Sequence, residues 1–239
     1  MLEVQQEEQQ KYSVNIAPSV SDTLAQFVKK ASQMRGLVFG NKIDSLLSGG
    51  LAPNTLTFLY GKNADSLTNI LCGNSVRIFG GRSVFIDAAN CFDPYLIVDR
   101  CVPIKSEASA RKFCERITVF RAFTCYQLRK LVADKLRKEI AKRDGEHVRS
   151  VFVTGIDSVF SEDDNTKEEI EAIQLLMAQD LAKIASSKQN GVLFVVASSK
   201  ERSEHFVSKC DTAIKLYSAP GLKAMLAKHS ARQYAAADL

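Results

Sequence analysis

Residues 55–68 read TLTFLYGKNADSLT, and this junction decides the fold. Residues 55–60 are β-branched, aromatic and nearly all apolar, which is typical of a strand buried on both faces. Gly61 ends this run, and a helical pattern occupies residues 66–79. A buried strand, a short loop and a helix form the first unit of a parallel α/β sheet, in which ligands bind at the loop after the strand.

The alternation of strands and helices continues along the chain. It predicts an α/β fold with a mostly parallel central sheet, helices on both faces and a C-terminal antiparallel hairpin over 212–230, around Pro220 and Gly221. The further strands are expected at 83–87, 117–120, 150–156 and 191–197, and the further helices at 94–101, at about 124–143 and at about 167–186.

The composition is that of a globular protein. The chain has 239 residues, of which 46% are hydrophobic and 25% charged, so it can bury a core without disulfides, and a mostly disordered chain is excluded. No apolar stretch reaches the roughly 18 residues of a membrane span, and the first residues are polar and acidic. We expect an N-terminal arm at 1–20, one core domain at 21–239 that begins with a helix at Ser21, no membrane association, and a cytoplasmic location (nuclear in a eukaryote).

Cysteine and histidine do not suggest a metal centre. The six cysteines form no CxxC pair and lie among apolar residues, as expected for small buried side chains in a reducing compartment. The three histidines are scattered, so neither a metal site nor a Ser-His-Asp or Cys-His catalytic group is predicted.

The loop after the first strand matches the phosphate-loop pattern G-x-x-x-x-G-K-[ST] in part. Gly61 and Thr68 agree with it, but Ser66 replaces the second glycine and Leu67 replaces the lysine. The glycines let backbone amides close around phosphate, and the lysine neutralises the β and γ oxygens. Leucine supplies neither charge nor donor. An ordinary strand-to-helix turn is the alternative interpretation of this segment.

Five stretches of the chain, in order, resemble RecA/RadA-type recombinases. The chain is similar to an archaeal or eukaryotic recombinase paralogue reduced to its ATPase core, and the resemblance implies a RecA-like P-loop fold. The stretches are GNKIDSLLSGGL at 40–51, FIDAANCFDP at 85–94, ITVFRA at 117–122, VTGIDS at 153–158 and CDTAIKL at 210–216.

The resemblance also implies a vestigial nucleotide site. The phosphate-binding lysine would fall at Leu67, the glutamate that activates water at Ala89, and a polar sensor pair at Ser198-Ser199. Asp157 and Thr68 stand where the family has the two residues on the magnesium side of the nucleotide, and both keep the family's residue type. Asp157 could equally cap the turn after its strand. Phosphoryl transfer depends on positioning and charge neutralisation. We therefore expect no ATP hydrolysis, no ATP or magnesium cofactor and no enzyme activity; a rearranged loop that binds or weakly hydrolyses ATP is the alternative.

The net charge of +5 is unevenly distributed. Residues 100–150 hold 14 Lys and Arg against 6 Asp and Glu, whereas residues 155–180 hold 8 acidic residues against Lys167. The expected helix at 124–143 has an apolar stripe toward the sheet and a basic solvent face. The basic face is either an ordinary solvated surface or a binding surface for the phosphates of a nucleic acid backbone. Phe206, in the loop after the fifth strand, is a candidate for base stacking. The candidate DNA-binding residues are Arg129, Lys130, Arg137, Lys138, Lys200, Arg202 and Lys209.

Together these features predict a non-catalytic RecA/RadA-like accessory factor in homologous recombination and DNA repair. Its expected partners are DNA, single-stranded rather than double-stranded, and a recombinase or another paralogue; an oligomer is also compatible with the resemblance. A purely structural subunit of a paralogue complex is the remaining alternative.

Overall fold

The computed structural model describes Leu37 and residues 50–102, 106–142, 146–160, 166–187, 191–199, 203–219, 221–229 and 236–238. All of these lie in one compact unit that spans residues 34–239. The expected arm at 1–20 and the helix expected from Ser21 lie outside the described residues.

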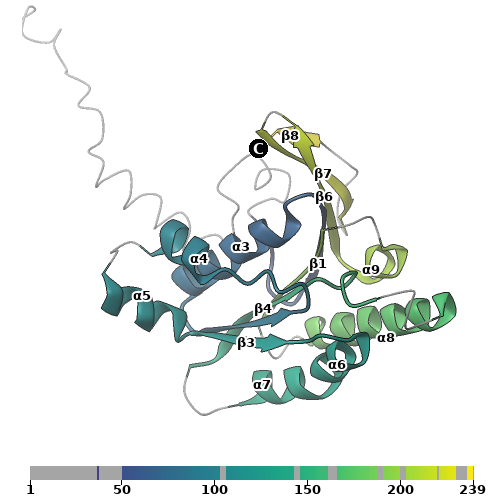
Figure 1. Cartoon of the computed structure of the whole chain (residues 1–239), viewed down its shortest axis with the longest axis horizontal. Coiled ribbons are helices and arrows are strands. Elements are labelled where there is room, and N and C mark those ends of the chain that lie inside the picture. The colour runs from purple at the N-terminus through teal and green to yellow at the C-terminus, as the bar shows by residue number, and fades with distance from the viewer. Residues whose placement is uncertain are drawn as a thin grey trace, which may run out of the picture. The chain divides into compact units, whose positions relative to one another are not determined.

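The described strands form one sheet with the order β3-β2-β4-β5-β1-β6-β7-β8 (Figure 1). The strands from β3 to β6 in this order are parallel, while β7 pairs antiparallel with β6 and β8 antiparallel with β7. The predicted α/β fold with a mostly parallel sheet is confirmed, and it is consistent with a RecA-like core. The strands are β1 Leu56–Gly61, β2 Arg82–Asp87, β3 Ile117–Arg121, β4 Val148–Thr154, β5 Leu193–Ser198, β6 Thr212–Ala219, β7 Gly221–His229 and β8 Ala236–Asp238.

Helices cover both faces of the sheet, as expected. Helices α3 and α4 pack on one face, with α5 beside them, and α6, η1, α7, α8 and α9 pack on the other (Figure 1). The helices are α3 Ala64–Phe79, α4 Pro94–Cys101, α5 Glu107–Cys114, α6 Cys125–Lys130, the π-helical η1 Leu131–Leu136, α7 Arg137–Ala141, α8 Lys167–Ala185 and α9 Glu204–Lys209.

Strand β1 belongs to both hydrophobic cores. Phe58 and Leu59 are fully buried and belong to the two different core clusters, one on each face of the sheet. This explains the unbroken apolar run, since a central parallel strand has no solvent face. Because β1 pairs with both β5 and β6, its carboxyl end lies in the middle of the sheet edge. The loop after β1 is therefore surrounded by the ends of other strands.

Several elements differ from the prediction. Strand β4 ends at Thr154 because Gly155 has a φ of 68° and opens a turn, whereas the apolar pattern suggested a strand at 150–156. Helices α5 and α9 were not predicted. The expected single helix at 124–143 is divided into α6, η1 and α7, and π-helical segments of this kind often occur at functional sites.

Candidate functional sites

The loop between β1 and α3 is too short for a phosphate loop. Strand β1 ends at Gly61 and α3 begins at Ala64, so that only Lys62 and Asn63 lie between them. The phosphate-loop pattern places four residues between its two glycines, and their backbone amides surround the phosphates. Here Ser66, Leu67 and Thr68 already belong to α3, whose backbone is committed to helical geometry. The vestigial site predicted from the sequence therefore also lacks the loop itself.

Gly61 has a structural reason to be glycine. Its φ of 103° lies in a region that L side chains rarely adopt, and a Cβ atom would collide with the carbonyl oxygen of Leu216 in β6. The close approach of the neighbouring strand therefore accounts for the residue that matched the phosphate-loop pattern.

Thr68 and Leu67 both contribute to packing in this structure. The Thr68 hydroxyl is fully buried and donates a hydrogen bond to the Ala64 carbonyl oxygen at 2.7 Å. Thr68 keeps the residue type that the resemblance expects, and in this structure its hydroxyl is engaged within α3. Leu67 packs against the hydrophobic core on the α3 face.

The loop after β2 is held in place by Asp87 and Asn69. The buried Asp87 carboxylate accepts hydrogen bonds from the backbone N–H groups of Cys91 and Phe92, at 3.0 and 3.1 Å. Asn69 of α3 donates to the Cys91 carbonyl oxygen and accepts from the Asp93 N–H. These bonds hold the 88–93 loop against α3.

Ala89 lies in that loop, where the resemblance expects the water-activating glutamate. A Cβ atom on Gly155 would meet the Ala89 backbone nitrogen and methyl group, so the loop lies directly against the start of the turn after β4. Asp157, in the same turn, is half-buried. Alanine has no group that could orient a water molecule.

Acidic side chains gather around the start of α3. Burial, followed by the nearby charges of Asp157 and Asp87, raises the pKa of Asp65 to about 6, while a hydrogen bond to Ser199 acts in the opposite direction. Carboxylates from α3, β2 and the turn after β4 thus share one electrostatic environment. Among the described residues, no group of three or more His, Cys, Asp or Glu side chains could hold a metal ion. An anionic site without a phosphate loop disfavours a triphosphate.

The cysteines agree with the sequence interpretation in part. None of the six cysteines forms a disulfide; Cys72, Cys101, Cys125 and Cys210 are buried, whereas Cys91 and Cys114 are half-buried. Burial raises the pKa of the Cys91 thiol to about 12, so this cysteine is not an activated nucleophile.

The predicted DNA-binding residues occupy different places. Lys130 and Lys138 line one groove, and Arg129 is exposed on the same helix, whereas Arg137 forms an ion pair with Asp180 at 3.6 Å. Lys209 ends α9, which packs on α8. Lys200 and Arg202 lie outside the described residues. In the described parts, the sequence-based set thus comes from two places in the fold, the α6–η1–α7 helix and α9.

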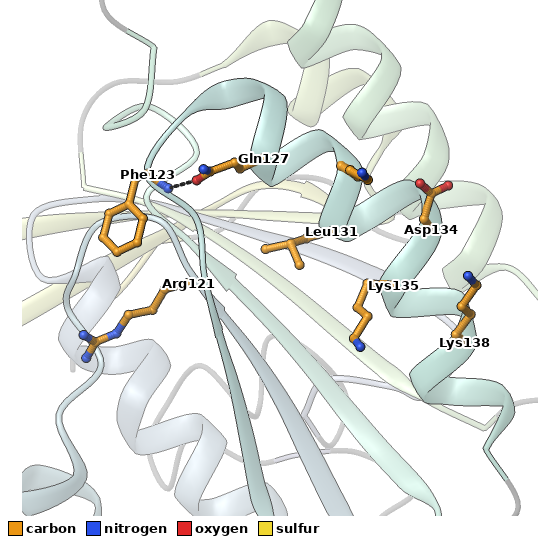
Figure 2. Close-up of a pocket in the computed structure, with 8 residues that line it drawn as sticks. Arg121, Phe123, Gln127, Leu131, Asp134, Lys135 and Lys138 are labelled. Atoms are coloured by element: carbon orange, nitrogen blue, oxygen red, sulfur yellow. Dashed lines mark hydrogen bonds between the residues drawn. The ribbon is translucent and has the colours of Figure 1, made fainter.

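The groove, called here the β3–α6 groove, lies between the end of β3 and the α6–η1–α7 helix. Figure 2 shows Arg121 and Phe123 on the strand side, and Leu131 and Lys135 directed toward them from the helix. Its volume is about 470 Å³, within the range of small-molecule sites. The lining residues are Arg121, Phe123, Gln127, Lys130, Leu131, Asp134, Lys135 and Lys138.

Phe123 was not singled out from the sequence. Its side chain is 71% exposed, and its backbone N–H donates to Gln127 Oε1 at 2.8 Å, which fixes the turn that presents the ring (Figure 2). Phe206, the aromatic residue expected to stack on bases, is instead fully buried against Phe58, with the ring centroids 5.5 Å apart. That earlier expectation is wrong, because α9 directs Phe206 into the core.

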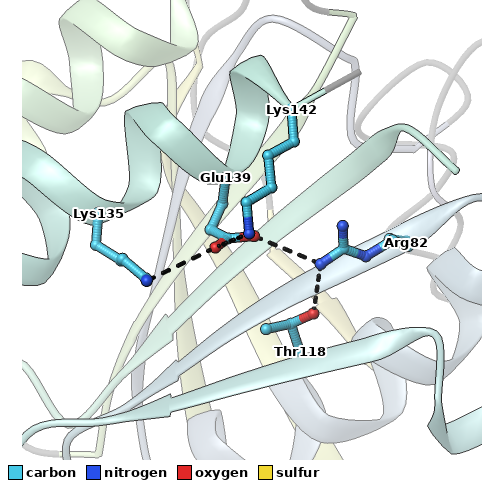
Figure 3. A network of polar contacts seen from close by, with 5 residues as sticks. All are labelled: Arg82, Thr118, Lys135, Glu139 and Lys142. Atoms are coloured by element: carbon cyan, nitrogen blue, oxygen red, sulfur yellow. Dashed lines mark hydrogen bonds and ion pairs between the residues drawn. The ribbon is translucent and has the colours of Figure 1, made fainter. Parts of the chain in front are cut away.

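Glu139 anchors the basic helix to the sheet. Its side chain is 3% exposed and lies 2.6 Å from Lys142, 3.5 Å from Arg82 and 4.0 Å from Lys135 (Figure 3). Burial by itself raises the pKa of Glu139, but the charges of these three cations outweigh it and lower the pKa below its usual range. Arg82 also donates to the Thr118 hydroxyl, so this network connects the helix with β2 and β3.

The chain shows no match to known protein families or curated sequences. None of the described helices has both the length and the apolar character needed to cross a bilayer.

Proposed function

We propose that this chain is a RecA/RadA-like paralogue that does not hydrolyse ATP and acts as an accessory factor in homologous recombination and DNA repair. The observation that carries the proposal is the junction between β1 and α3, where helix replaces the phosphate loop in a RecA-like sheet. In this proposal the fold has lost its nucleotide chemistry and serves to bind DNA, a recombinase, or both. It would act in the cytoplasm, or in the nucleus of a eukaryote.

Three features support the loss of hydrolysis. Leu67 packs into the core where a phosphate-binding lysine would stand, and Ala89 offers no base. Asp65 lies close enough to Asp157 and Asp87 for their charges to add to the effect of burial and raise its pKa, so acidic groups gather at this junction. Removing both the cation and the water-orienting group from a phosphoryl-transfer site costs several orders of magnitude in rate.

The basic helix supports DNA as the partner. Clustered cations on an exposed helix face give binding that is independent of sequence and sensitive to salt. Arg129, Lys130 and Lys138 are exposed on this helix, which Glu139 anchors to the sheet.

The proposal is tested with the recombinase of the same organism. The full chain is added to strand-exchange reactions in which that recombinase pairs single-stranded with double-stranded DNA, and binding of the chain to the recombinase is measured in parallel. We expect a change in the rate or yield of exchange, with no dependence on ATP binding by this chain. An unchanged exchange reaction, together with no binding to the recombinase or to DNA, would contradict the proposal.

A further inference from the structure

The β3–α6 groove combines two properties that the proposed function has not used. It is lined by cations from the end of β3 and from the helix, Arg121, Lys130 and Lys138, and by the exposed Phe123 ring. Figure 2 shows the Phe123 ring at the Arg121 end of the groove and Lys138 at the other end. Cations that follow a phosphate backbone and a ring on which bases stack are the two components of single-strand binding sites.

We propose that the β3–α6 groove binds single-stranded DNA, with a base stacked on Phe123 and the flanking phosphates held by Arg121, Lys130 and Lys138. This inference rests on the proposed function, and it names the DNA-binding site that the proposed function requires.

The charges of the groove are available for a ligand. Lys135 lies near Glu139 and 5.6 Å from the Phe120 ring centroid, Lys142 is bonded to Glu139, and Arg137 pairs with Asp180. In the described parts of the chain, Arg121, Lys130 and Lys138 have no carboxylate within ion-pair distance; each is exposed. The protein thus neutralises the cations that anchor the helix, Lys135 among them, and leaves Arg121, Lys130 and Lys138 to a partner. Asp134 is the one acidic side chain that lines the groove.

The exposed ring favours a single strand over a duplex. Phe123 presents 71% of its surface to solvent from a turn that Gln127 fixes, so little ordering is needed when a base covers the ring. Bases of a duplex are already stacked on one another and have no free face for the ring. Leu131 adds apolar surface to the lining of the groove.

A peptide is the competing occupant. In the described sheet β3 is an edge strand, and an extended acidic segment of a partner could pair with it. The three cations without ion-pair partners and the exposed ring favour a ligand with regularly spaced anions and flat apolar faces, which is a nucleic acid strand. The experiment below separates the two.

The test uses the full chain and a fluorescein-labelled dT20 strand, followed by anisotropy from about 50 to 300 mM salt. The charge variant is Lys130→Gln/Lys138→Gln, and its matched control is Arg111→Gln/Lys112→Gln, which removes the same charge from exposed positions on α5. The ring variant is Phe123→Ala, and its control is Tyr95→Ala, whose side chain is 85% exposed on α4. Thermal unfolding of each variant checks that it is folded.

We expect the charge variant to bind dT20 at least tenfold more weakly and to reduce the slope of log K against log salt by about 1.4, as two lost phosphate contacts require on a single strand. Phe123→Ala should lower the affinity for dT20 about fivefold to a hundredfold. It should leave binding of heparin, a polyanion without bases, unchanged. Both control variants should bind like the parent chain.

Other outcomes would overturn the inference in distinguishable ways. If the parent chain binds dT20 and the groove variants bind equally well, the groove is not the site, although the proposed function survives. If the groove variants keep dT20 binding but lose the recombinase, the groove docks a peptide. Tighter binding of a 20-base-pair duplex or of rU20 than of dT20 would also contradict it. A last outcome separates the two proposals. If the groove variants lose dT20 binding but the parent chain hydrolyses ATP, the groove is the DNA-binding site and the proposed function is refuted.

Discussion

The hydroxyl of Thr68 donates to the carbonyl oxygen of Ala64 at 2.7 Å, inside the first turns of α3. In a phosphate-loop protein the residue at this position points toward a metal ion bound by the nucleotide. Here its hydroxyl is committed to the helix, because the helix begins before the position of the second glycine. In the proposed function, the loss of nucleotide chemistry therefore rests on the backbone as well as on the side chains.

Restoring the missing side chains should not restore nucleotide binding. The double variant Ser66→Gly/Leu67→Lys supplies the pattern's glycine and lysine, but Lys62 and Asn63 remain the entire loop. We expect no binding of a fluorescent ATP analogue with magnesium, for the double variant as for the parent chain. Saturable binding by the double variant alone would mean that the two side chains, rather than the short loop, limit the site.

Gly61→Ala should destabilise the fold by about 2–4 kcal/mol. The new methyl group would face the Leu216 carbonyl oxygen, and the residue would keep a positive φ. Gly191→Ala is the matched control, because Gly191 also has a positive φ, 59°, but nothing lies within 4 Å of its Cβ position. Its cost should be about 1 kcal/mol. Urea unfolding measures both, and equal costs would contradict the steric account of Gly61.

Asp65→Asn should stabilise the protein at neutral pH. The folded-state pKa of Asp65 is about 6, above its ordinary 3.8, so its contribution to stability is full below 3.8 and is lost as the pH rises through 6. Above pH 6 the free energy of unfolding of Asp65→Asn should exceed that of the parent chain by on the order of 1 kcal/mol. The difference is modest because Asp65 is only partly buried.

The gain in Asp65→Asn should shrink when unfolding is measured near pH 4. Glu171→Gln, on the exposed face of α8, serves as the control and should change stability little at either pH. A gain in Asp65→Asn that is equally large at both pH values would contradict the electrostatic account of the sheet edge.

Glu139→Gln should destabilise the protein by about 1–3 kcal/mol at pH 7. It leaves Arg82, Lys142 and Lys135 without their common partner, although the two lysines are half-exposed and regain water. The folded-state pKa of Glu139 is lowered, so its contribution is present above the ordinary value of 4.5 and is lost as the pH falls through the folded-state pKa. The free energy of unfolding of the parent chain and of Glu139→Gln, measured between pH 7 and pH 3, tests this pH dependence. A destabilisation by Glu139→Gln that grows toward low pH would contradict the ion-pair explanation.

Asp134→Asn should strengthen binding of dT20. It removes the acidic side chain that lines the β3–α6 groove and leaves the cations in place. We expect about a two- to fivefold gain at low salt that fades as salt screens the charge. A gain that persists unchanged at high salt would show that repulsion of phosphates is not the cause.

The sequence predicts elements well where local signals are strong. Helix α4 was expected at 94–101 and lies there, because Asp93 caps it and Pro94 starts it. Helix α5 spans only eight residues and none of them is fully buried, so its few apolar residues gave only a weak helical pattern in the sequence.

The candidate sites were less predictable. Leu67 and Ala89 were recognised as losses, but a pattern with fixed spacing cannot reveal that Asn63 adopts a left-handed conformation and that α3 begins directly after it. The exposure of Phe123 depends on β3 being an edge strand, which is set by the order of the whole sheet. The start of α3 and the exposure of Phe123 are both decided by the tertiary arrangement rather than by local propensity.

Phosphate release from ATP by the purified full chain tests the central claim most directly. It is measured with and without dT20, for the parent chain and for Asp157→Ala, a change in the half-buried turn after β4. We expect no release above a protein-free blank in any of these reactions. Release in excess of the protein concentration that Asp157→Ala abolishes would contradict it.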